Sequence, residues 1–179
     1  MDLSKYDNKT YQPGAGAIKR LGWYFTSVLF VNTYFFPISF IKVFLLRLFG
    51  AKIGTSVNIK PKVNIKYPWR LVIGDYSWVG ENVWIDNLDD VTIGNNVCLS
   101  QGSMLLCGNH DYKKDSFDLI TGKIVLEDGV WIGAKAIVCP GVTCKNHSVL
   151  TTGSIATRNM EEYGIYRGNP AVLIRNRQK

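Results

Sequence analysis

The stretch IGDYSWVGENVWIDNLDDVTIGNNVCLSQGSML, residues 73–105, decides the fold. Aliphatic residues recur in it at every sixth position, first at Ile73, Val79 and Ile85, then at Ile93, Leu99 and Leu105. The same spacing occurs on both sides, at Ile53, Ile59, Ile65, Leu126, Ile132, Val138, Cys144 and Leu150. A helical period does not sustain such a repeat, whereas a short strand followed by a tight turn does. We therefore predict an all-β domain, a parallel β-helix of six-residue repeats from Ile53 to about Ala156.

Two further positions of the repeat carry information. The residue after the aliphatic one is often glycine, as at Gly54, Gly74, Gly80, Gly94 and Gly133. A small or β-branched residue stands four places after it: Val57, Val63, Ser77, Val83, Val97, Ser103, Val130, Ala136, Val142, Ser148 and Ser154. We expect the aliphatic side chains to fill a narrow core and the glycines to permit the turn geometry. Two extra residues follow every third repeat, twice, which predicts three faces per coil with a bulge at one corner.

Local residue composition divides the chain into regions. Residues 1–20 are polar and contain glycine and proline, so we expect an extended arm. Residues 21–50 are rich in aromatic and aliphatic side chains. Residues 51–160 form the predicted β-helix, from which residues 106–123 leave as a loop, and residues 161–179 form a C-terminal tail.

The apolar region 21–50 could in principle form a transmembrane helix. No residue between Arg20 and Lys42 is charged, which is long enough to span a bilayer, but polar residues dilute the stretch and Pro37 divides it. The second half, which ends at Gly50, places apolar residues at helical spacing: Ile41, Phe44, Leu45 and Leu48. We expect two short amphipathic helices packed on the β-helix or on a neighbouring subunit. A spanning helix, and a helix lying on a membrane surface, remain alternatives.

Composition excludes several classes. The chain is 46% hydrophobic and 20% charged, as folded proteins are, and its formal charge is +7. No Lys/Arg run exceeds two residues and no nucleic-acid motif occurs, so we expect no nucleic-acid partner. The basic residues near the C-terminus suit phosphates of a small ligand: Arg158, Arg167, Arg175, Arg177 and Lys179. The four cysteines lack metal-site spacing and the first twenty residues are polar, so we expect no metal and a reducing, cytoplasmic compartment.

The six-residue spacing of aliphatic residues has one long interruption. After Leu105 comes LCGNHDYKKDSFDLITGK, residues 106–123, and the spacing resumes only at Leu126. A loop leaving a rigid scaffold is a frequent place for function, and this one contains His110, one of two histidines. A histidine is suited to removing a proton from a hydroxyl near neutral pH. The alternative is a surface-loop histidine without a role.

Four segments carry a resemblance to a known family: IGDYSWVGENVWID (73–86), IGNNVCLSQGSMLL (93–106), LEDGVWIGAKAIVCPGVTC (126–144) and GNPAVLIR (168–175). They resemble the hexapeptide-repeat acyltransferases, and the arm followed by FLLRLFGAKIG (44–54) resembles the colanic acid and other polysaccharide-biosynthesis acetyltransferases. The resemblance implies a left-handed β-helix of triangular section. The general preference for right-handed crossovers would have indicated the opposite winding.

The resemblance also implies a reaction. In this family an excursion loop presents the catalytic base, and GNHDY (108–112) matches its motif. His110 would take the proton from an acceptor hydroxyl as it attacks the thioester of acetyl-CoA, and a backbone N–H would stabilise the oxyanion. A covalent acyl-enzyme through Cys107 is a rival that the family does not need. His147 is expected to be an exposed turn residue.

Acceptor and cofactor contacts are carried over by position. The acceptor candidates are Asp86, Asn87, Asn109, Asp111 and Tyr112, for each of which an ordinary turn or solvated role stays open. The cofactor candidates are Gly133, Ala134, Thr152, Gly153, Thr157, Arg158 and Arg175. Val172 stands where some members of the family carry arginine, so the residue that would bind the 3′-phosphate of CoA is not identified. Trp78, Trp84 and Trp131 are interpreted as packing residues.

The resemblance further implies a homotrimer that binds acetyl-CoA between subunits and acts on a sugar hydroxyl. Flat faces and exposed edges of a β-helix also favour coverage by a neighbour. Two other functions are weighed. A γ-carbonic-anhydrase-like metal enzyme needs three histidines, and the chain has two. A non-catalytic trimeric scaffold would keep the β-helix but has no need of the His110 loop.

Overall fold

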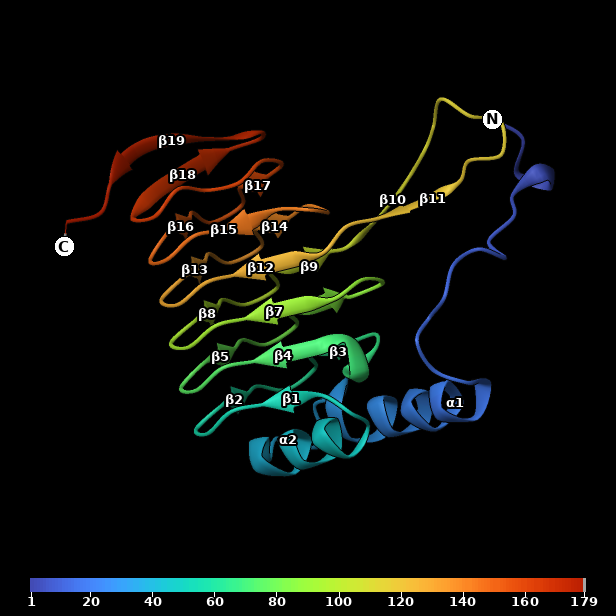
Figure 1. The fold of residues 1–179 in the computed structure, drawn as a ribbon. Helices are drawn as coiled ribbons and strands as arrows, with labels where there is room; N and C mark the ends of the chain where they lie inside the picture. Colours follow the sequence, from blue (N-terminus) through green and yellow to red (C-terminus); the bar gives the residue numbers. More distant parts are fainter. Residues whose placement is uncertain (179) are drawn as a thin grey trace.

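The computed structural model describes residues 1–178 and contains a parallel β-helix with two helices at one end (Figure 1). Each coil passes through three sheets. Sheet A contains β1 (Lys52–Ile53), β4 (Leu71–Ile73), β7 (Val91–Ile93), β12 (Ile124–Leu126) and β15 (Thr143–Cys144). Sheet B contains β2 (Asn58–Ile59), β5 (Trp78–Val79), β8 (Cys98–Leu99), β13 (Trp131–Ile132), β16 (Val149–Leu150), β18 (Gly164–Gly168) and β19 (Ala171–Asn176). Sheet C contains β3 (Asn64–Ile65), β6 (Trp84–Asp86), β9 (Met104–Leu106), β14 (Ile137–Val138) and β17 (Ile155–Ala156).

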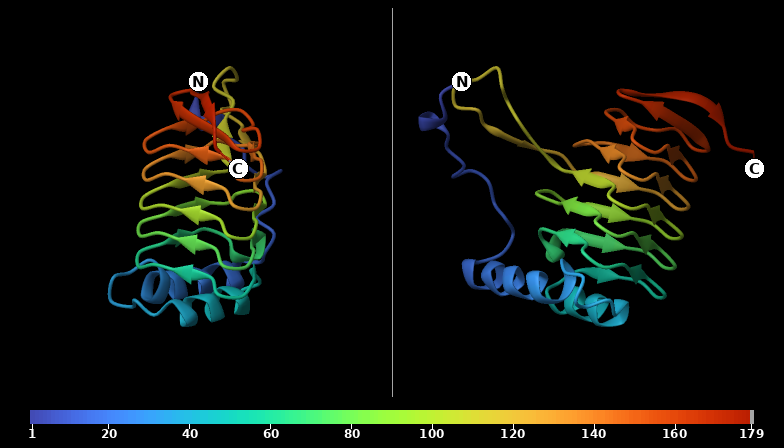
Figure 2. Two further views of the ribbon diagram at one scale, coloured as in Figure 1. Left: turned by 90° about the vertical axis from the view of Figure 1, so that its left-hand side faces the viewer. Right: turned by 180° about the vertical axis from the view of Figure 1, so that it is seen from behind.

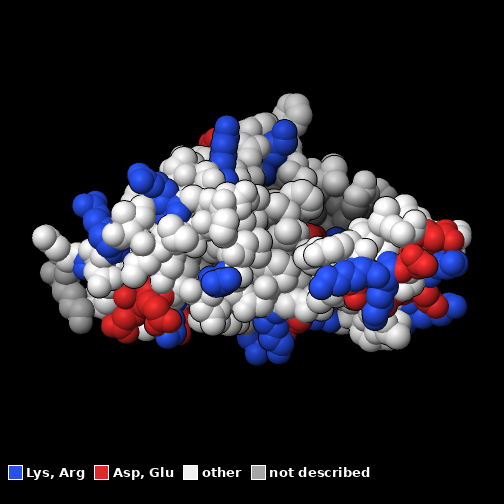
Figure 3. Space-filling view, turned by 90° about the horizontal axis from the view of Figure 1, so that it is seen from above, with Lys and Arg blue, Asp and Glu red and all other residues white. Residues whose placement is uncertain are grey.

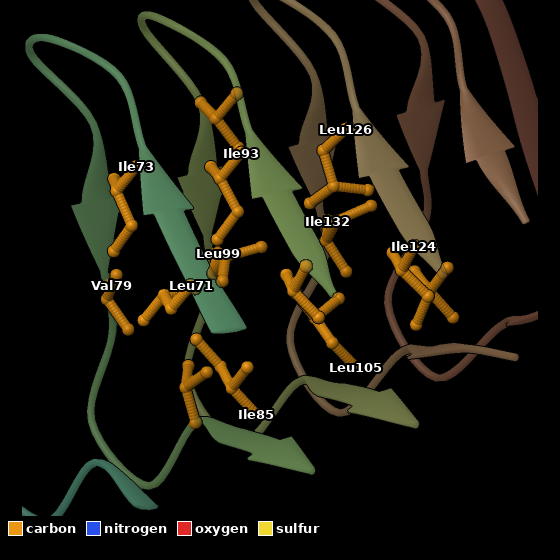
Figure 4. Close-up of a cluster of buried hydrophobic side chains, with 14 of the residues drawn as sticks. Leu71, Ile73, Val79, Ile85, Ile93, Leu99, Leu105, Ile124, Leu126 and Ile132 are labelled. Atoms are coloured by element: carbon orange, nitrogen blue, oxygen red, sulfur yellow. The ribbon is translucent and has the colours of Figure 1, made fainter. Parts of the chain in front are cut away.

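The six-residue repeat forms the core as predicted. Ile73 pairs with Ile93 and Ile93 with Leu126 in sheet A, so equivalent repeats lie one above the other. These side chains are at most 1% exposed, and those of the other two sheets meet them in the centre of each coil (Figure 4). The stacked coils are visible from two further sides in Figure 2. The parallel pairing of β18 with β16 extends the β-helix to residue 168, after which β19 turns back antiparallel.

The prediction that the repeat glycines provide turn geometry is wrong. The turns do contain a residue in the left-handed region, but it lies three places after the aliphatic residue, as at Asn82 (φ 58°) and Gly102 (φ 65°). Gly80, directly after Val79, is needed for another reason. A Cβ atom there would lie 2.8 Å from the carbonyl oxygen of Leu99 and 2.9 Å from the backbone nitrogen of Gln101. Glycine at this position therefore permits the close approach of successive coils.

Two helices cover the first coil, as predicted. Helix α1 (Ala17–Thr26) continues into the π-helical turn η2 (Ser27–Val31), and α2 (Ser39–Leu48) follows. The indole of Trp23 fixes α1 by donating a hydrogen bond of 2.8 Å to the Ile65 carbonyl. Among residues 1–178, no helix has the length and apolar character needed to cross a bilayer.

The face of α2 that packs on the β-helix differs from the predicted one. Lys42, Val43 and Leu46 are buried against the first coil. Phe44 and Leu48, expected to pack, are 61% and 67% exposed. Apolar residues occur on both sides of this helix, so their spacing alone could not select the inner side. The consequence is that the helical cap, residues 17–48, has an apolar outer face.

Lys42 is an unusual residue for the inner face of α2. Its side chain is fully buried and its Nζ donates one hydrogen bond of 2.9 Å to the Lys60 carbonyl. Burial lowers the pKa of the Lys42 ammonium below its ordinary value, because the charged form loses its hydration. Below that lowered pKa, the unfolded chain holds the proton more favourably than the folded chain does, and Lys42 reduces stability.

Lys42→Met is therefore expected to stabilise the protein at pH 7, by about 1 kcal/mol. The gain should shrink as the pH rises through the lowered pKa of Lys42 toward 10.5, where wild-type Lys42 is neutral in both states. Urea unfolding of both proteins across this pH range measures the difference. A less stable Lys42→Met protein at pH 7 would show that the bond to the Lys60 carbonyl outweighs the cost of burying the charge.

Candidate active site

One corner of the β-helix collects the irregular segments of the coils, as the extra residues in the repeat predict. This C–A corner joins the end of sheet C to the start of sheet A. It contains the 3-10 turn η3 (Pro68–Arg70), residues 87–90 and the excursion 107–123. Segments far apart in the sequence thus lie one above the other at the place where the predicted loop leaves the scaffold.

The excursion is a β-hairpin. Strand β10 (Gly108–His110) pairs antiparallel with β11 (Leu119–Thr121), and His110 lies opposite Leu119. Figure 1 shows the hairpin projecting from the β-helix toward the N-terminal arm. A hairpin orders the histidine more firmly than an irregular loop, because ladder hydrogen bonds fix the backbone on both sides.

His110 is held in a defined orientation and protonation pattern. Its Nδ1 lies 2.8 Å from the Phe117 carbonyl oxygen, and its ring stacks on the Phe117 ring at 4.3 Å between centroids. A carbonyl oxygen only accepts hydrogen bonds, so Nδ1 carries the proton. In the neutral ring Nε2 then has the free lone pair, which is the state that a general base requires. The ring is half-buried.

The carbonyl that orients His110 comes from a strained residue. Phe117 has φ 50°, in the left-handed region that non-glycine residues seldom occupy. The hairpin tip maintains this conformation, since the Phe117 backbone nitrogen donates to the Lys114 carbonyl at 3.1 Å. A conformation of this kind persists where the surrounding structure fixes it.

The three loop candidates for the acceptor lie around His110 but differ in their contacts. Asn109 is exposed, and its Oδ1 accepts a 2.8 Å hydrogen bond from the backbone nitrogen of His110. Asp111 is half-buried and its carboxylate accepts from the backbone nitrogen of Lys113. Tyr112 is 75% exposed, so its ring is available to a ligand.

Asp86 and Asn87 reach the base of the same corner. The Asn87 side chain is fully buried, accepts from the backbone nitrogen of Tyr67 and donates to the Tyr67 carbonyl. Asp86 accepts from Lys66 Nζ at 3.0 Å. The amide oxygen and the amide nitrogen of Asn87 are thus both bonded to the preceding coil, whereas the second oxygen of Asp86 keeps acceptor capacity.

The N-terminal arm forms the outer wall of the site, which the sequence did not indicate. The Tyr11 hydroxyl donates to the Leu88 carbonyl at 2.7 Å, and the Trp69 indole donates to the Pro13 carbonyl at 2.7 Å. At the far end, the Asp2 backbone nitrogen donates to the Asp115 carbonyl of the hairpin tip. The polar arm contains the turn η1 (Leu3–Lys5) and is fixed at both ends, but it is shorter than the predicted residues 1–20, because α1 begins at Ala17.

A cavity of about 710 Å³ lies between the arm, the C–A corner and the hairpin. It is rich in carboxylates, and its lining includes Asp7, Asp89, Asp111, Asp118, Arg70 and Lys114. His110 is not part of the lining, but its chain neighbour Asp111 is, and the Asp111 backbone nitrogen donates to the Asp118 carbonyl across the hairpin. Carboxylates accept hydrogen bonds from hydroxyl groups, so the lining suits a polyhydroxylated molecule.

Cys107 lies three residues from His110 but in a different environment. Its side chain is fully buried, and burial raises the pKa of the thiol to about 12. A cysteine acts as a nucleophile in its thiolate form, which this burial opposes. The location of Cys107 thus disfavours the acyl-enzyme alternative.

The cofactor candidates fall into three places within one chain. Gly133 and Ala134 stack on Thr152 and Gly153 at the B–C corner, where the Gly153 nitrogen donates to the Ala134 carbonyl at 2.9 Å. Thr157 and Arg158 are exposed at the C–A corner, two coils beyond the His110 hairpin. Arg175 is exposed on β19. The structure therefore joins the first four, and places the two corner groups at opposite edges of sheet C.

The outer face of sheet C between these corners is apolar. Trp84, Met104, Ile137 and Ile155 stand in register on successive strands. The interpretation of the tryptophans as packing residues is wrong for the single chain, because Trp78, Trp84 and Trp131 are 60%, 44% and 48% exposed. They occupy outward positions of the strands, where side chains alternate with the core residues.

The second histidine is distant from the first along the coil. His147 lies in the turn between β15 and β16 at φ 57° and its ring stacks on Tyr163 at 5.0 Å. It is a turn residue, as predicted, but half-buried. Within residues 1–178, no three His, Cys, Asp or Glu side chains are grouped so that they could hold a metal ion.

Comparisons with known proteins identify the relatives of the chain. No family model matches it. It is 43% identical over 136 residues to WcaF of Escherichia coli (strain K12), assigned as a colanic acid biosynthesis acetyltransferase, covering 76% of this chain and 75% of that protein. It is 29% identical over 135 residues to a galactoside O-acetyltransferase of the same organism, covering 73% and 66%.

Solved structures share the fold. The hexapeptide-repeat acetyltransferase VCA0836 of Vibrio cholerae, crystallised with acetyl coenzyme A, superposes with a TM-score of 0.84 at 22% identity over 100% of both chains. A galactoside acetyltransferase in complex with coenzyme A gives 0.80 at 26% identity, over 89% of this chain and 80% of that one. The β-helix is thus of the left-handed type. With the identity to WcaF, these likenesses show that the chain belongs to the hexapeptide-repeat acetyltransferases.

Proposed function

We propose that this protein transfers an acetyl group from acetyl-CoA to a hydroxyl of a sugar or polysaccharide precursor, with His110 as the general base. The observation that carries the proposal is the contact of His110 Nδ1 with the Phe117 carbonyl, which leaves Nε2 free to accept a proton. The names of the relatives support the reaction and its acceptor class. The carboxylate-rich cavity at the hairpin, whose lining includes Asp111, the chain neighbour of His110, supports an acceptor with several hydroxyl groups.

Each part of the site has a distinct task in this proposal. Acetyl-CoA supplies the acetyl group as a thioester. His110 Nε2 takes the proton of the acceptor hydroxyl, whose oxygen then attacks the thioester carbonyl, so transfer is direct. As the imidazole gains its positive charge, the Phe117 carbonyl stabilises it through the Nδ1–H bond. The same histidine can return the proton to the departing thiolate.

The residues proposed to hold acetyl-CoA have properties that fit it. The space around Gly153 is open and Thr152 is exposed, so an extended chain can approach the backbone of the B–C corner. Arg158 and Arg175 are exposed and form no ion pair within residues 1–178. Their guanidinium groups are therefore available to phosphate oxygens, which arginine binds through paired hydrogen bonds.

Cys107→Ala tests the direct route. We expect kcat to stay within about twofold of wild type, because a buried thiol with a raised pKa takes no part in the transfer. Steady-state rates of CoA release measure this. A loss as large as that of a nucleophile variant, with a melting temperature close to wild type, would instead support an acetyl-cysteine intermediate.

We further propose a homotrimer with acetyl-CoA between neighbouring subunits. The outward-facing apolar row of Trp84, which is exposed, and of Met104, Ile137 and Ile155, which are half-buried, supports a neighbour across sheet C, since both groups of cofactor candidates flank it. Sedimentation equilibrium of the purified chain should give three times the mass of 20.1 kDa. A monomer at all concentrations would remove both the trimer and the site between subunits.

A further inference from the structure

Exposed apolar side chains are concentrated on the helical cap. Of the 26 large hydrophobic residues that are exposed in the described part of the chain, 13 lie within residues 17–48. They are Ile18, Leu21, Tyr24, Phe25, Val28, Leu29, Phe30, Tyr34, Phe35, Ile38, Phe40, Phe44 and Leu48. Two of these are almost fully exposed, Phe35 at 98% and Ile18 at 91%. Single exposed apolar residues are ordinary, but a contiguous group marks an interaction surface.

The exposed residues of the two helices point away from the β-helix. In α1, Trp23 faces inward, and Ile18, Leu21 and Phe25 follow the opposite side at helical spacing. In α2, Phe40, Phe44 and Leu48 form a row four residues apart on the side opposite the buried Leu46. Because both helices lie across the first coil, their outer sides form one end of the molecule (Figures 1 and 2).

The charge around this end has one sign. No Asp or Glu occurs between Asp7 and Asp75, whereas residues 8–74 contain ten Lys and Arg. This segment thus carries +10 of a total formal charge of +7, and the rest of the chain carries −3. Arg20, Lys52, Lys60 and Lys62 are exposed and form no ion pair within residues 1–178. The opposite end, seen in Figure 3, carries acidic as well as basic side chains.

From this arrangement we propose that the helical cap docks on the surface of an anionic lipid bilayer. The outer sides of α1 and α2 would lie in the plane of the interface, with their aromatic and aliphatic side chains among the headgroups and upper acyl chains. The surrounding Lys and Arg side chains would meet lipid phosphates. Neither helix crosses the bilayer, in agreement with their short lengths of 10 residues each.

The charges favour a lipid surface over a second copy of the cap. Two caps placed face to face would bring the unpaired Arg20, Lys52, Lys60 and Lys62 of both copies together, and residues 8–74 provide no carboxylate to pair them. An anionic bilayer provides both an apolar layer and the opposite charge. In this position the β-helix stands on the membrane with its axis away from it, and the His110 hairpin lies several coils from the surface.

Vesicle flotation tests the proposal with the full-length protein. One set of vesicles contains phosphatidylcholine alone and the other about 30 mol% phosphatidylglycerol. We expect flotation with the anionic vesicles at low salt, weaker binding as salt screens the basic residues, and little binding to the neutral vesicles. Equal binding to both vesicle types, or none to either, would overturn the proposal.

Variants of outward residues locate the surface. Phe25→Ser/Phe44→Ser should lower the partition coefficient about tenfold or more, because both rings leave the interface. Leu21→Ser/Leu48→Ser serves as a second pair, and Arg20→Gln/Lys52→Gln should lower binding to anionic vesicles alone. The matched control is Val172→Ser/Ile174→Ser, two exposed apolar residues on β19 at the other end, which should bind as wild type does.

Two readouts separate docking from other roles of the cap. Melting temperatures within a few degrees of wild type show that the variants are folded. Sedimentation identifies subunit contacts, since a change of oligomeric state in both apolar pairs would assign the cap to a second copy and contradict the proposal. Unchanged sedimentation with reduced flotation supports it. These results are independent of acetyl transfer, so they stand or fail separately from the proposed reaction.

Discussion

His110→Ala is expected to lower kcat/KM for acetyl transfer by about 10²- to 10⁴-fold. The reason is that the acceptor hydroxyl would lose the proposed base, which the contact of 2.8 Å with the Phe117 carbonyl orients. Binding of acetyl-CoA should change little, because its proposed contacts lie at other residues. Initial rates of CoA release at several acceptor concentrations, together with calorimetric binding of CoA, measure the two effects separately.

His147→Ala is the matched control for this substitution. It removes the second histidine, which stacks on Tyr163 in a distant turn. We expect a catalytic rate within about twofold of wild type and some loss of stability, since the stacked ring is lost. Equal rates for wild type and His110→Ala would remove the base assignment. A large loss of rate in His147→Ala with intact folding would contradict the assignment of His110 and indicate His147 as the base.

Leu99→Ala is expected to lower the free energy of unfolding by about 2–5 kcal/mol. Leu99 is 1% exposed and lies in sheet B between Val79 and Ile132 of the adjoining coils. Each coil contacts only its neighbours, so a cavity here weakens both adjoining interfaces. Urea unfolding, monitored by far-ultraviolet circular dichroism, measures the change in the free energy of unfolding.

Val72→Ala provides the comparison for Leu99→Ala. Val72 lies on an outward position of β4 and is 37% exposed, so its truncation should cost less than about 1 kcal/mol. Similar losses for both variants would contradict the assignment of the narrow interior as the source of stability. A loss confined to Leu99→Ala agrees with the core described above.

The repeat was sufficient to predict a parallel β-helix with three faces per coil and the corner that bulges, but not its left-handed winding. It was not sufficient to explain its own glycines. The spacing shows that a glycine recurs at the position of Gly80, but it does not tell whether the glycine is needed for a turn or for the close approach of two coils. Only the distance from a Gly80 Cβ to the Leu99 carbonyl, 2.8 Å, separates the two reasons.

Helix packing marks another limit of the sequence. Both sides of α2 are apolar, and the residue that would have indicated the outer side, Lys42, is the buried one. A lysine is seldom buried without a charged partner, so the helical spacing pointed to Phe44 and Leu48 instead. The packing of α2 depends on the shape of the first coil, which no local pattern describes.

His110 could be found from the sequence because the repeat fails around it. Its orienting partner could not, since the Phe117 contact is made by a backbone carbonyl that any residue carries. The contacts of the N-terminal arm could not be predicted from the sequence either. Tyr11 and Pro13 reach the C–A corner through hydrogen bonds to residues more than 50 positions away, and polar arms with such contacts have no characteristic pattern.

The most direct test of the proposed function is a transfer assay with product analysis. Purified protein is incubated with acetyl-CoA and a panel of sugars and sugar precursors, while free thiol is followed and the acceptors are analysed by mass spectrometry. If the protein transfers acetyl groups as proposed, we expect thiol release that depends on the acceptor, with one acetyl ester on a sugar hydroxyl for each CoA released. No release with any acceptor, together with no binding of CoA, would contradict it and favour a non-catalytic scaffold.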